Sequence, residues 1–230
     1  MHRSADAPKQ ESKPSMTVKT AADGRRRCPW CLGSPEMVRY HDREWGVPVY
    51  QDRLLFEFLT LEGAQAGLSW SIVLAKRDGY RRAFANFDPG KVARFTKQDV
   101  QRLMQDTKIV RNRLKIESTV SNARAFLEVK REFGSFSAFV WAFIGGKPLQ
   151  NRRREMKQVP ARSALSDALS KDLKRRGFRF VGTTICYAFM QAVGMVDDHL
   201  TSCFRYALPI RRAENGAAPP RSRKRKEDGQ

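Results

Sequence analysis

The chain has 230 residues, of which 44 are Lys or Arg and 24 are Asp or Glu, so its formal net charge at pH 7 is +20. This excess favours a polyanionic partner such as nucleic acid, because each neutralised phosphate releases condensed counterions. The sequence has no apolar run of the roughly 20 residues that a membrane-spanning helix needs and no apolar stretch of a secretory signal near its N-terminus, so we expect a cytoplasmic protein without membrane contact.

Both ends of the chain have the composition of disordered tails. Residues 1–25 and 207–230 are polar and basic and contain few large apolar side chains, so they cannot bury enough surface to fold. We therefore expect two disordered basic tails around one globular domain at residues 26–206. In a reducing compartment, the four cysteines suggest metal ligands or buried thiols before disulfide bonds.

The residues between the tails show helical periodicity. Apolar side chains recur on one helical face in four stretches, at residues 54–59, 116–127, 165–173 and 185–193. Thr96 followed by Asp99 has the spacing of a capping box, and Gly177 after three basic residues is typical of a helix end. Residues 178–182, FRFVG, are the single stretch that we expect to be extended. The pattern predicts an all-α domain.

Cysteines and histidines are paired at the two ends of the predicted domain. Cys28 lies near His41, and His199 precedes Cys203 by four residues, which puts both on one helical face. Two thiolates and two imidazoles fill a tetrahedral zinc site and leave no open position, which is typical of a structural metal. Cys31 offers a rival set, because Cys28 and Cys31 form a C-x-x-C pair that can replace His41. Spacing alone favours this rival set, because C-x-x-C is the commoner metal-binding pair, although both sets stay open.

A carboxylate and several aromatic residues suggest a ligand pocket. Glu62 ends an apolar stripe, small residues follow it at 63–67, and Trp70 comes next. Aromatic faces beside one carboxylate suit a flat, cationic heterocycle. Further aromatic residues surround the first metal-ligand pair, at Trp30, Tyr40 and Trp45.

Four motifs resemble the bacterial 3-methyladenine DNA glycosylase I family: YHDREWGVP at 40–48, LEGAQAGLSW at 61–70, SDALSKDLKRRGFRFVGTTICYAFMQAVG at 166–194 and DDHLTSC at 197–203. The resemblance implies a helix-hairpin-helix DNA glycosylase fold, with one structural Zn²⁺ joining the N- and C-terminal parts. It implies the ligand set Cys28, His41, His199 and Cys203, with Cys31 as a bystander. It also implies a base pocket at Glu62, Trp70, Tyr40 and Trp30, with Trp45 nearby.

The resemblance implies where DNA contacts lie. Gly67 and Leu68 are expected to form a wedge that fills the gap left by a flipped base. A hairpin turn of this fold usually carries glycines whose amides contact phosphates, but the region that we match to it, DTKIVRNRLKI at 106–116, has none. We expect phosphate contacts there from Arg111, Arg113 and Lys115.

The implied function is base-excision repair of alkylated double-stranded DNA. The enzyme flips N3-methyladenine out of the duplex and hydrolyses its N-glycosidic bond, which releases free 3-methyladenine. Glu62 is the expected catalytic residue, since it accepts hydrogen bonds from the adenine edge and favours its positive charge. We expect a monofunctional, monomeric enzyme associated with the nucleoid. The alternatives are a zinc-stabilised nucleic-acid-binding module without activity and a metallohydrolase with catalytic zinc, against which four protein ligands argue.

Overall fold

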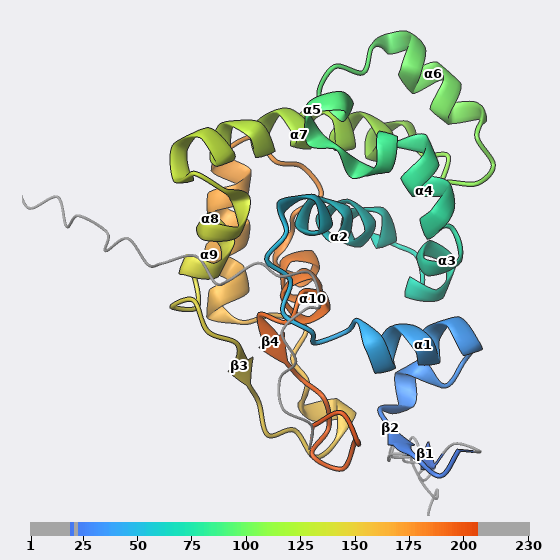
Figure 1. Cartoon of the computed structure of the whole chain (residues 1–230), viewed down its shortest axis with the longest axis vertical. Coiled ribbons are helices and arrows are strands. Elements are labelled where there is room, and N and C mark those ends of the chain that lie inside the picture. The colour runs from blue at the N-terminus through green and yellow to red at the C-terminus, as the bar shows by residue number, and fades with distance from the viewer. Residues whose placement is uncertain (1–18, 21–22, 207–230) are drawn as a thin grey trace, which may run out of the picture.

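The computed structural model describes residues 19–20 and 23–206 and is mostly helical over them, as predicted (Figure 1). Its α-helices are α1 (Pro35–Arg43), α2 (Asp52–Gln65), α3 (Trp70–Ala75), α4 (Arg77–Ala83), α5 (Pro89–Val92), α6 (Lys97–Gln105), α7 (Arg113–Phe133), α8 (Phe136–Ala142), α9 (Ala164–Arg175) and α10 (Thr183–Ala192). Three short 3-10 helices complete them, η1 (Pro29–Cys31), η2 (Ala85–Phe87) and η3 (Met156–Gln158). Among the described residues, no helix combines the length and the apolar character needed to cross a bilayer.

Helix α2 is the centre of the fold. All of its side chains from Leu55 to Ala64 are buried, because α7, α8 and α10 pack around it (Figure 1). A helix that is buried on every face places its polar residues in the interior as well. Glu62 is therefore enclosed by the fold and does not lie on a solvated face, with 4% of its surface exposed.

Local signals in the sequence explain where several helices begin and end. Thr96 and Asp99 form the predicted capping box at the start of α6, with reciprocal hydrogen bonds between side chain and backbone. Helix α9 ends at Arg175, and Gly177 follows with a φ of +86°, a conformation that glycine adopts without steric cost. The predicted stop at Gly177 is confirmed.

The prediction of an extended segment at 178–182 is wrong. These residues form no strand and instead make the turn between α9 and α10, in which Phe178 and Val181 are buried. The Ser170 hydroxyl donates to the carbonyl of Val181 at 2.6 Å, so a side chain takes the place of a partner strand. Two-residue strands occur elsewhere, as antiparallel β1 (Lys19–Thr20) with β2 (Arg26–Arg27) and parallel β3 (Leu149–Gln150) with β4 (Val196–Asp197).

The predicted tails lie largely outside the described residues. Of residues 1–25, the structure describes 19–20 and 23–25, and residues 207–230 are not described. At the described ends, the backbone amide of Phe204 donates to the carbonyl of Arg26 at 2.9 Å. The first and last described parts of the chain therefore meet, and this meeting point is where the predicted metal ligands lie.

Candidate active site

A cavity of about 190 Å³ opens between α1, α2, α3 and α10. All five residues predicted for the base pocket line it, although they come from different elements of the chain. The lining consists of Trp30, Tyr40, Trp45, Glu62, Gln65, Trp70, Met156, Val159, Ala188 and Gln191. The wall is thus mainly aromatic and aliphatic, with one carboxyl group and two amides.

Four aromatic rings line the cavity. The ring centroids of Tyr40 and Trp70 are 5.1 Å apart with an interplanar angle of 46°. Trp30 contacts Tyr40 edge-on at 6.3 Å and Trp45 at 5.0 Å. The indole nitrogen of Trp70 is buried and has no hydrogen-bond partner among the residues that the structure describes. A flat ligand in this cavity would meet π faces and one free N–H donor.

Burial controls the ionisation of the polar groups in the cavity. Burial alone raises the pKa of Glu62 to about 8. The pKa of Tyr40 is raised well above its ordinary range, first by burial and then by the negative charge of Glu62. The Tyr40 hydroxyl therefore keeps its proton at neutral pH and is a hydrogen-bond donor beside the carboxyl group.

Gln191 and Gln65 are cavity residues that sequence reasoning missed. Gln191 donates from Nε2 to Asp198 Oδ2 at 2.8 Å, and the same oxygen accepts from the Tyr187 hydroxyl at 2.7 Å. Asp198 thus fixes the amide of Gln191 beside the cavity. A polar residue in the otherwise apolar helix α10 is a signal for Gln191, but the sequence alone does not reveal which helix face meets the cavity.

Three of the predicted metal ligands come together. The ligand atoms of Cys28, His41 and Cys203 all lie within 4.8 Å of one another, and all three residues are buried. His41 Nε2 is 3.5 Å from Cys203 Sγ, and its Nδ1 is 2.8 Å from a carboxylate oxygen of Asp42. A hydrogen bond from Cys28 lowers the pKa of Cys203, which favours the thiolate that a metal ion requires.

The fourth predicted ligand, His199, lies beside this group. Its ring centroid is 4.9 Å from that of His41. Its Nδ1 is 2.7 Å from Asp197 Oδ1, while its Nε2 is buried without a partner in the described part of the chain. Both histidines therefore use a carboxylate to orient the ring and leave Nε2 for another partner, as metal-binding histidines do. The donor set and the unpartnered nitrogen fit a zinc ion.

Cys31 does not belong to this group of three residues, although its thiol also lies within hydrogen-bonding reach of His41. Its thiol donates to the backbone carbonyl of Cys28 at 3.1 Å, which closes the short 3-10 turn of η1. Trp30 in the same turn packs against His41 with a centroid distance of 5.4 Å, and Trp45 packs against His199 at 4.6 Å. The metal cluster and the cavity therefore share two aromatic walls.

The predicted wedge lies at the turn between α2 and α3. Gly67 has a φ of +77°, which explains the glycine at the tip, and Leu68 is 36% exposed. The turn joins Glu62 in α2 to Trp70, the first residue of α3. The tip is thus exposed at the edge of the cavity that those two residues line.

The three residues predicted to contact phosphates within 106–116 differ in their exposure and in their hydrogen-bond partners. Arg111 and Arg113 are exposed, and Arg113 lies 3.6 Å from Glu117. Lys115 is placed differently, since its ammonium group donates to the backbone carbonyls of Ala64 and Ala66.

The turn between α9 and α10 has the glycines that 106–116 lacks. Gly177 and Gly182 flank it, and Gly182 precedes α10 without a side-chain cap, which leaves the first amides of that helix available. Asn122 of α7 holds the turn by donating to the carbonyl of Arg179 at 2.9 Å and accepting from its amide at 2.8 Å. Arg175 and Arg179 are exposed beside it.

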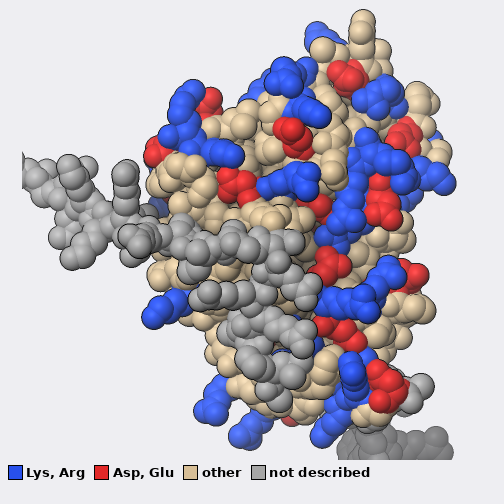
Figure 2. Space-filling model, viewed as in Figure 1, with Lys and Arg blue, Asp and Glu red and all other residues tan. Residues whose placement is uncertain are grey.

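On the face shown in Figure 2, basic side chains do not form a single stripe. Lys and Arg side chains are spread over the face shown in Figure 2, with Asp and Glu among them. Net charge therefore supports a polyanionic partner without locating its binding face.

Comparison with known proteins connects this geometry to a family. Residues 30–206 match the family model described as methyladenine glycosylase. The DNA-3-methyladenine glycosylase 1 of Escherichia coli is 49% identical over 180 residues, which cover 78% of this chain and 96% of that protein. A DNA-3-methyladenine glycosylase of Haemophilus influenzae is 48% identical over 177 residues, which cover 77% of this chain and 96% of that protein.

Solved structures agree with these relatives. A crystal structure of 3-methyladenine DNA glycosylase I is 51% identical and superposes with a TM-score of 0.76, with 77% of this chain and 98% of that chain covered. The Staphylococcus aureus enzyme, solved for the structural basis of 3-methyladenine recognition, is 38% identical with a TM-score of 0.76. The match covers 77% of this chain and 95% of that chain.

Proposed function

Because this chain belongs to the methyladenine glycosylase family, we propose that its aromatic cavity receives 3-methyladenine flipped out of alkylated duplex DNA. The observation that carries this proposal is Glu62, a buried carboxyl group with a pKa raised to about 8 in the cavity that Tyr40 and Trp70 also line. A buried carboxyl group without a fixed cation has its pKa lowered when a cationic ligand enters. The cavity is therefore suited to a flat base that carries positive charge.

The reaction needs little acid catalysis from the protein. Methylation at N3 gives adenine a positive charge, so the base is already a good leaving group. When the C1′–N9 bond breaks, its electron pair passes to the base, which leaves as neutral 3-methyladenine. Water adds to the sugar carbon and releases one proton to solvent. The protein supplies a dry, preorganised environment that accepts this base and rejects uncharged ones.

Each cavity residue has a role in this proposal. Glu62 accepts hydrogen bonds from the adenine edge and favours its positive charge, while Trp70 and Tyr40 contact the ring faces. The free indole N–H of Trp70 offers a donor to the base. Trp30 and Trp45 close the cavity on the side of the metal cluster.

A structural zinc ion is part of the proposal. Cys28, His41, His199 and Cys203 would hold it, and four protein ligands leave no position for water or substrate. Its contribution is to stabilise the fold by joining the two ends of the proposed domain at 26–206. Catalysis proceeds without it as a reactant.

We place the DNA along the exposed turn that carries Gly67 and Leu68. The wedge would fill the gap in the base stack, and the hairpin of α9 and α10 would bind phosphates through the free amides after Gly182. This hairpin has the glycines that 106–116 lacks, while Arg111 and Arg113 remain candidates for additional phosphate contacts. We propose a monomer that acts on DNA in the cytoplasm.

Release of free base separates this function from the alternative of a zinc-stabilised binding module. Purified protein is incubated with methylated duplex DNA, and the released bases are separated by chromatography. We expect 3-methyladenine to appear without strand breaks, since no lysine is assigned as a Schiff-base nucleophile. DNA binding without base release would favour the binding module, and strand cleavage by the pure protein would rule out the monofunctional mechanism.

A further inference from the structure

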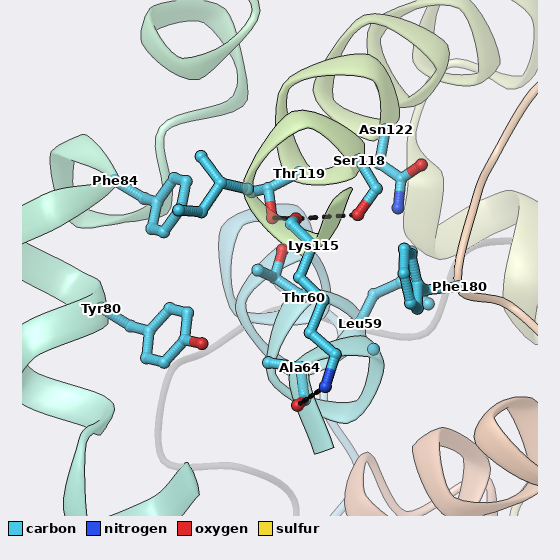
Figure 3. Close-up of a pocket in the computed structure, with 12 residues that line it drawn as sticks. Leu59, Thr60, Ala64, Tyr80, Phe84, Lys115, Ser118, Thr119, Asn122 and Phe180 are labelled. Atoms are coloured by element: carbon cyan, nitrogen blue, oxygen red, sulfur yellow. Dashed lines mark hydrogen bonds between the residues drawn. The ribbon is translucent and has the colours of Figure 1, made fainter. Parts of the chain in front are cut away.

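Lys115 of α7 reaches across to the end of α2. Its Nζ donates to the carbonyl oxygen of Ala64 at 2.8 Å (Figure 3). It also donates to the carbonyl oxygen of Ala66 at 2.6 Å. Carbonyls in the last turn of a helix have no partner within the helix, and a cation there also interacts favourably with the helix dipole. The lysine thus caps α2 from a helix that begins about 50 residues later in the chain.

The backbone around Lys115 is itself fixed. Its carbonyl accepts hydrogen bonds from the hydroxyl groups of Ser118 at 2.8 Å and Thr119 at 2.9 Å (Figure 3), and its amide donates to the Asn112 side chain at 3.1 Å. Burial lowers the pKa of Lys115, because the ammonium group has exchanged part of its hydration for the two carbonyls. The side chain is half-buried, and its ammonium group is bound to the two carbonyls of α2 instead of extending into solvent.

The segment that Lys115 caps, around Ala64 and Ala66, lies between the residues proposed to bind the base. Glu62 precedes it, Trp70 follows it, and Gly67 and Leu68 lie at its tip. Within the turn, the amide of Leu68 donates to the carbonyl of Gln65 at 2.6 Å. This local bond shapes the turn, whereas Lys115 ties it to the rest of the fold.

We propose that Lys115 is a positioning residue for base excision, which fixes the wedge at Gly67–Leu68 relative to the pocket residues Glu62 and Trp70. The inference rests on the proposed function of the cavity. A flipped base can stay in the pocket only while the wedge fills the gap that the base has left in the stack. The distance between the wedge and the pocket must therefore stay constant while the base flips. The hydrogen bonds of Lys115 to Ala64 and Ala66 maintain that spacing.

The experiment compares Lys115→Met, which keeps the apolar stem and removes the donors, with Lys115→Arg, which keeps donors and charge. Lys97→Met at an exposed position of α6 is the matched control. Base release is measured under single-turnover conditions on methylated duplex DNA and on the same DNA after strand separation. We expect the rate of base release from duplex DNA to fall about ten- to a hundredfold in Lys115→Met. This is the scale of loss that a misplacement near 1 Å causes in an active site.

The pattern of this loss distinguishes positioning from other roles. If Lys115 positions the wedge, the rate of base release should fall much less on separated strands, where no stacked gap has to be filled. Lys115→Arg should partly restore the rate on duplex DNA. The salt dependence of DNA binding should stay unchanged. A phosphate contact would instead lower the slope of log K against log salt by about one. That result, or an equal loss on both substrates, overturns the inference.

A second measurement does not depend on activity. Amide hydrogen exchange at Leu68 should become faster in Lys115→Met and stay as in the wild type in Lys97→Met. Unchanged exchange at Leu68 in Lys115→Met contradicts the inference. Wild-type protein that releases no base would contradict the proposed function, while the exchange experiment would still test Lys115.

Discussion

At the scale of single residues, burial changes the ionisation of Glu62, the carboxyl group of the proposed base pocket. The residue belongs to a helix that is buried on every face, and desolvation raises its pKa to about 8. In the free protein at neutral pH, the carboxyl group is therefore mostly protonated. In the proposed function, a cationic base would reverse this preference, so proton release from Glu62 would be coupled to binding of the base.

The pH dependence of kcat/KM tests this coupling, because it reports the pKa values of the free enzyme. The ionised form of Glu62 is the competent one, so kcat/KM should rise with pH and level off above about 8. In Glu62→Gln this rise should disappear along with most of the activity. A profile that keeps the same rise in Glu62→Gln would assign the titration to another group.

The sequence identified the residues that form the pocket, but not every residue of its wall. Glu62 and Trp70 stand out because a lone carboxylate and an indole flank a run of small residues, and the family resemblance extended the set. Gln191 was missed because only the packing of α10 determines which of its faces meets the cavity. Lys115 was assigned to phosphate because a lysine in a basic loop gives no sign that it caps another helix.

At the scale of elements, the hairpin of α9 and α10 is held in shape from outside. Asn122 of α7 is 6% exposed and makes two hydrogen bonds with the backbone of Arg179 at the hairpin turn. The predicted helices were correct here, and the predicted extended segment between them was wrong. Periodicity detects helices, whereas a turn that a distant side chain stabilises leaves no periodic signal.

Asn122→Ala tests whether this turn binds DNA. Removing both hydrogen bonds leaves two backbone groups of Arg179 without partners, which should cost about 1–3 kcal/mol of unfolding free energy. Affinity for undamaged duplex DNA should fall as well, while binding of free 3-methyladenine stays unchanged. The measurements are denaturant unfolding, DNA titration at fixed salt and titration with the free base. Lower stability with unchanged DNA affinity would exclude the hairpin as a DNA contact.

At the scale of the whole molecule, the two ends of the described chain meet at the group formed by Cys28, His41 and Cys203. The amide of Leu200 points at Cys28 Sγ from 3.5 Å, and His41 and Cys203 complete the contact. A link between positions so distant in sequence removes much of the entropy of the unfolded chain. The sequence indicated the ligand types but left Cys28 and Cys31 as an alternative pair, because spacing does not show where a side chain points.

Metal content and thermal stability test the proposed zinc link. We expect about one zinc ion per chain, and its loss in His199→Ala should lower the midpoint of thermal unfolding. Cys31→Ser is the matched control, since Cys31 donates to a backbone carbonyl, and it should keep its zinc. The opposite pattern, with zinc kept in His199→Ala and lost in Cys31→Ser, would select the rival ligand set.

The aromatic cavity around Glu62 and Trp70 is the proposed place of methyladenine excision, on which every role assigned above depends. The most direct test measures 3-methyladenine released from methylated duplex DNA under single-turnover conditions, by the wild-type protein and by folded Trp70→Ala. We expect release by the wild type and a loss of about a hundredfold in Trp70→Ala, the scale of lost positioning in an active site. Equal rates for the two proteins would place the chemistry elsewhere in the molecule and contradict the account.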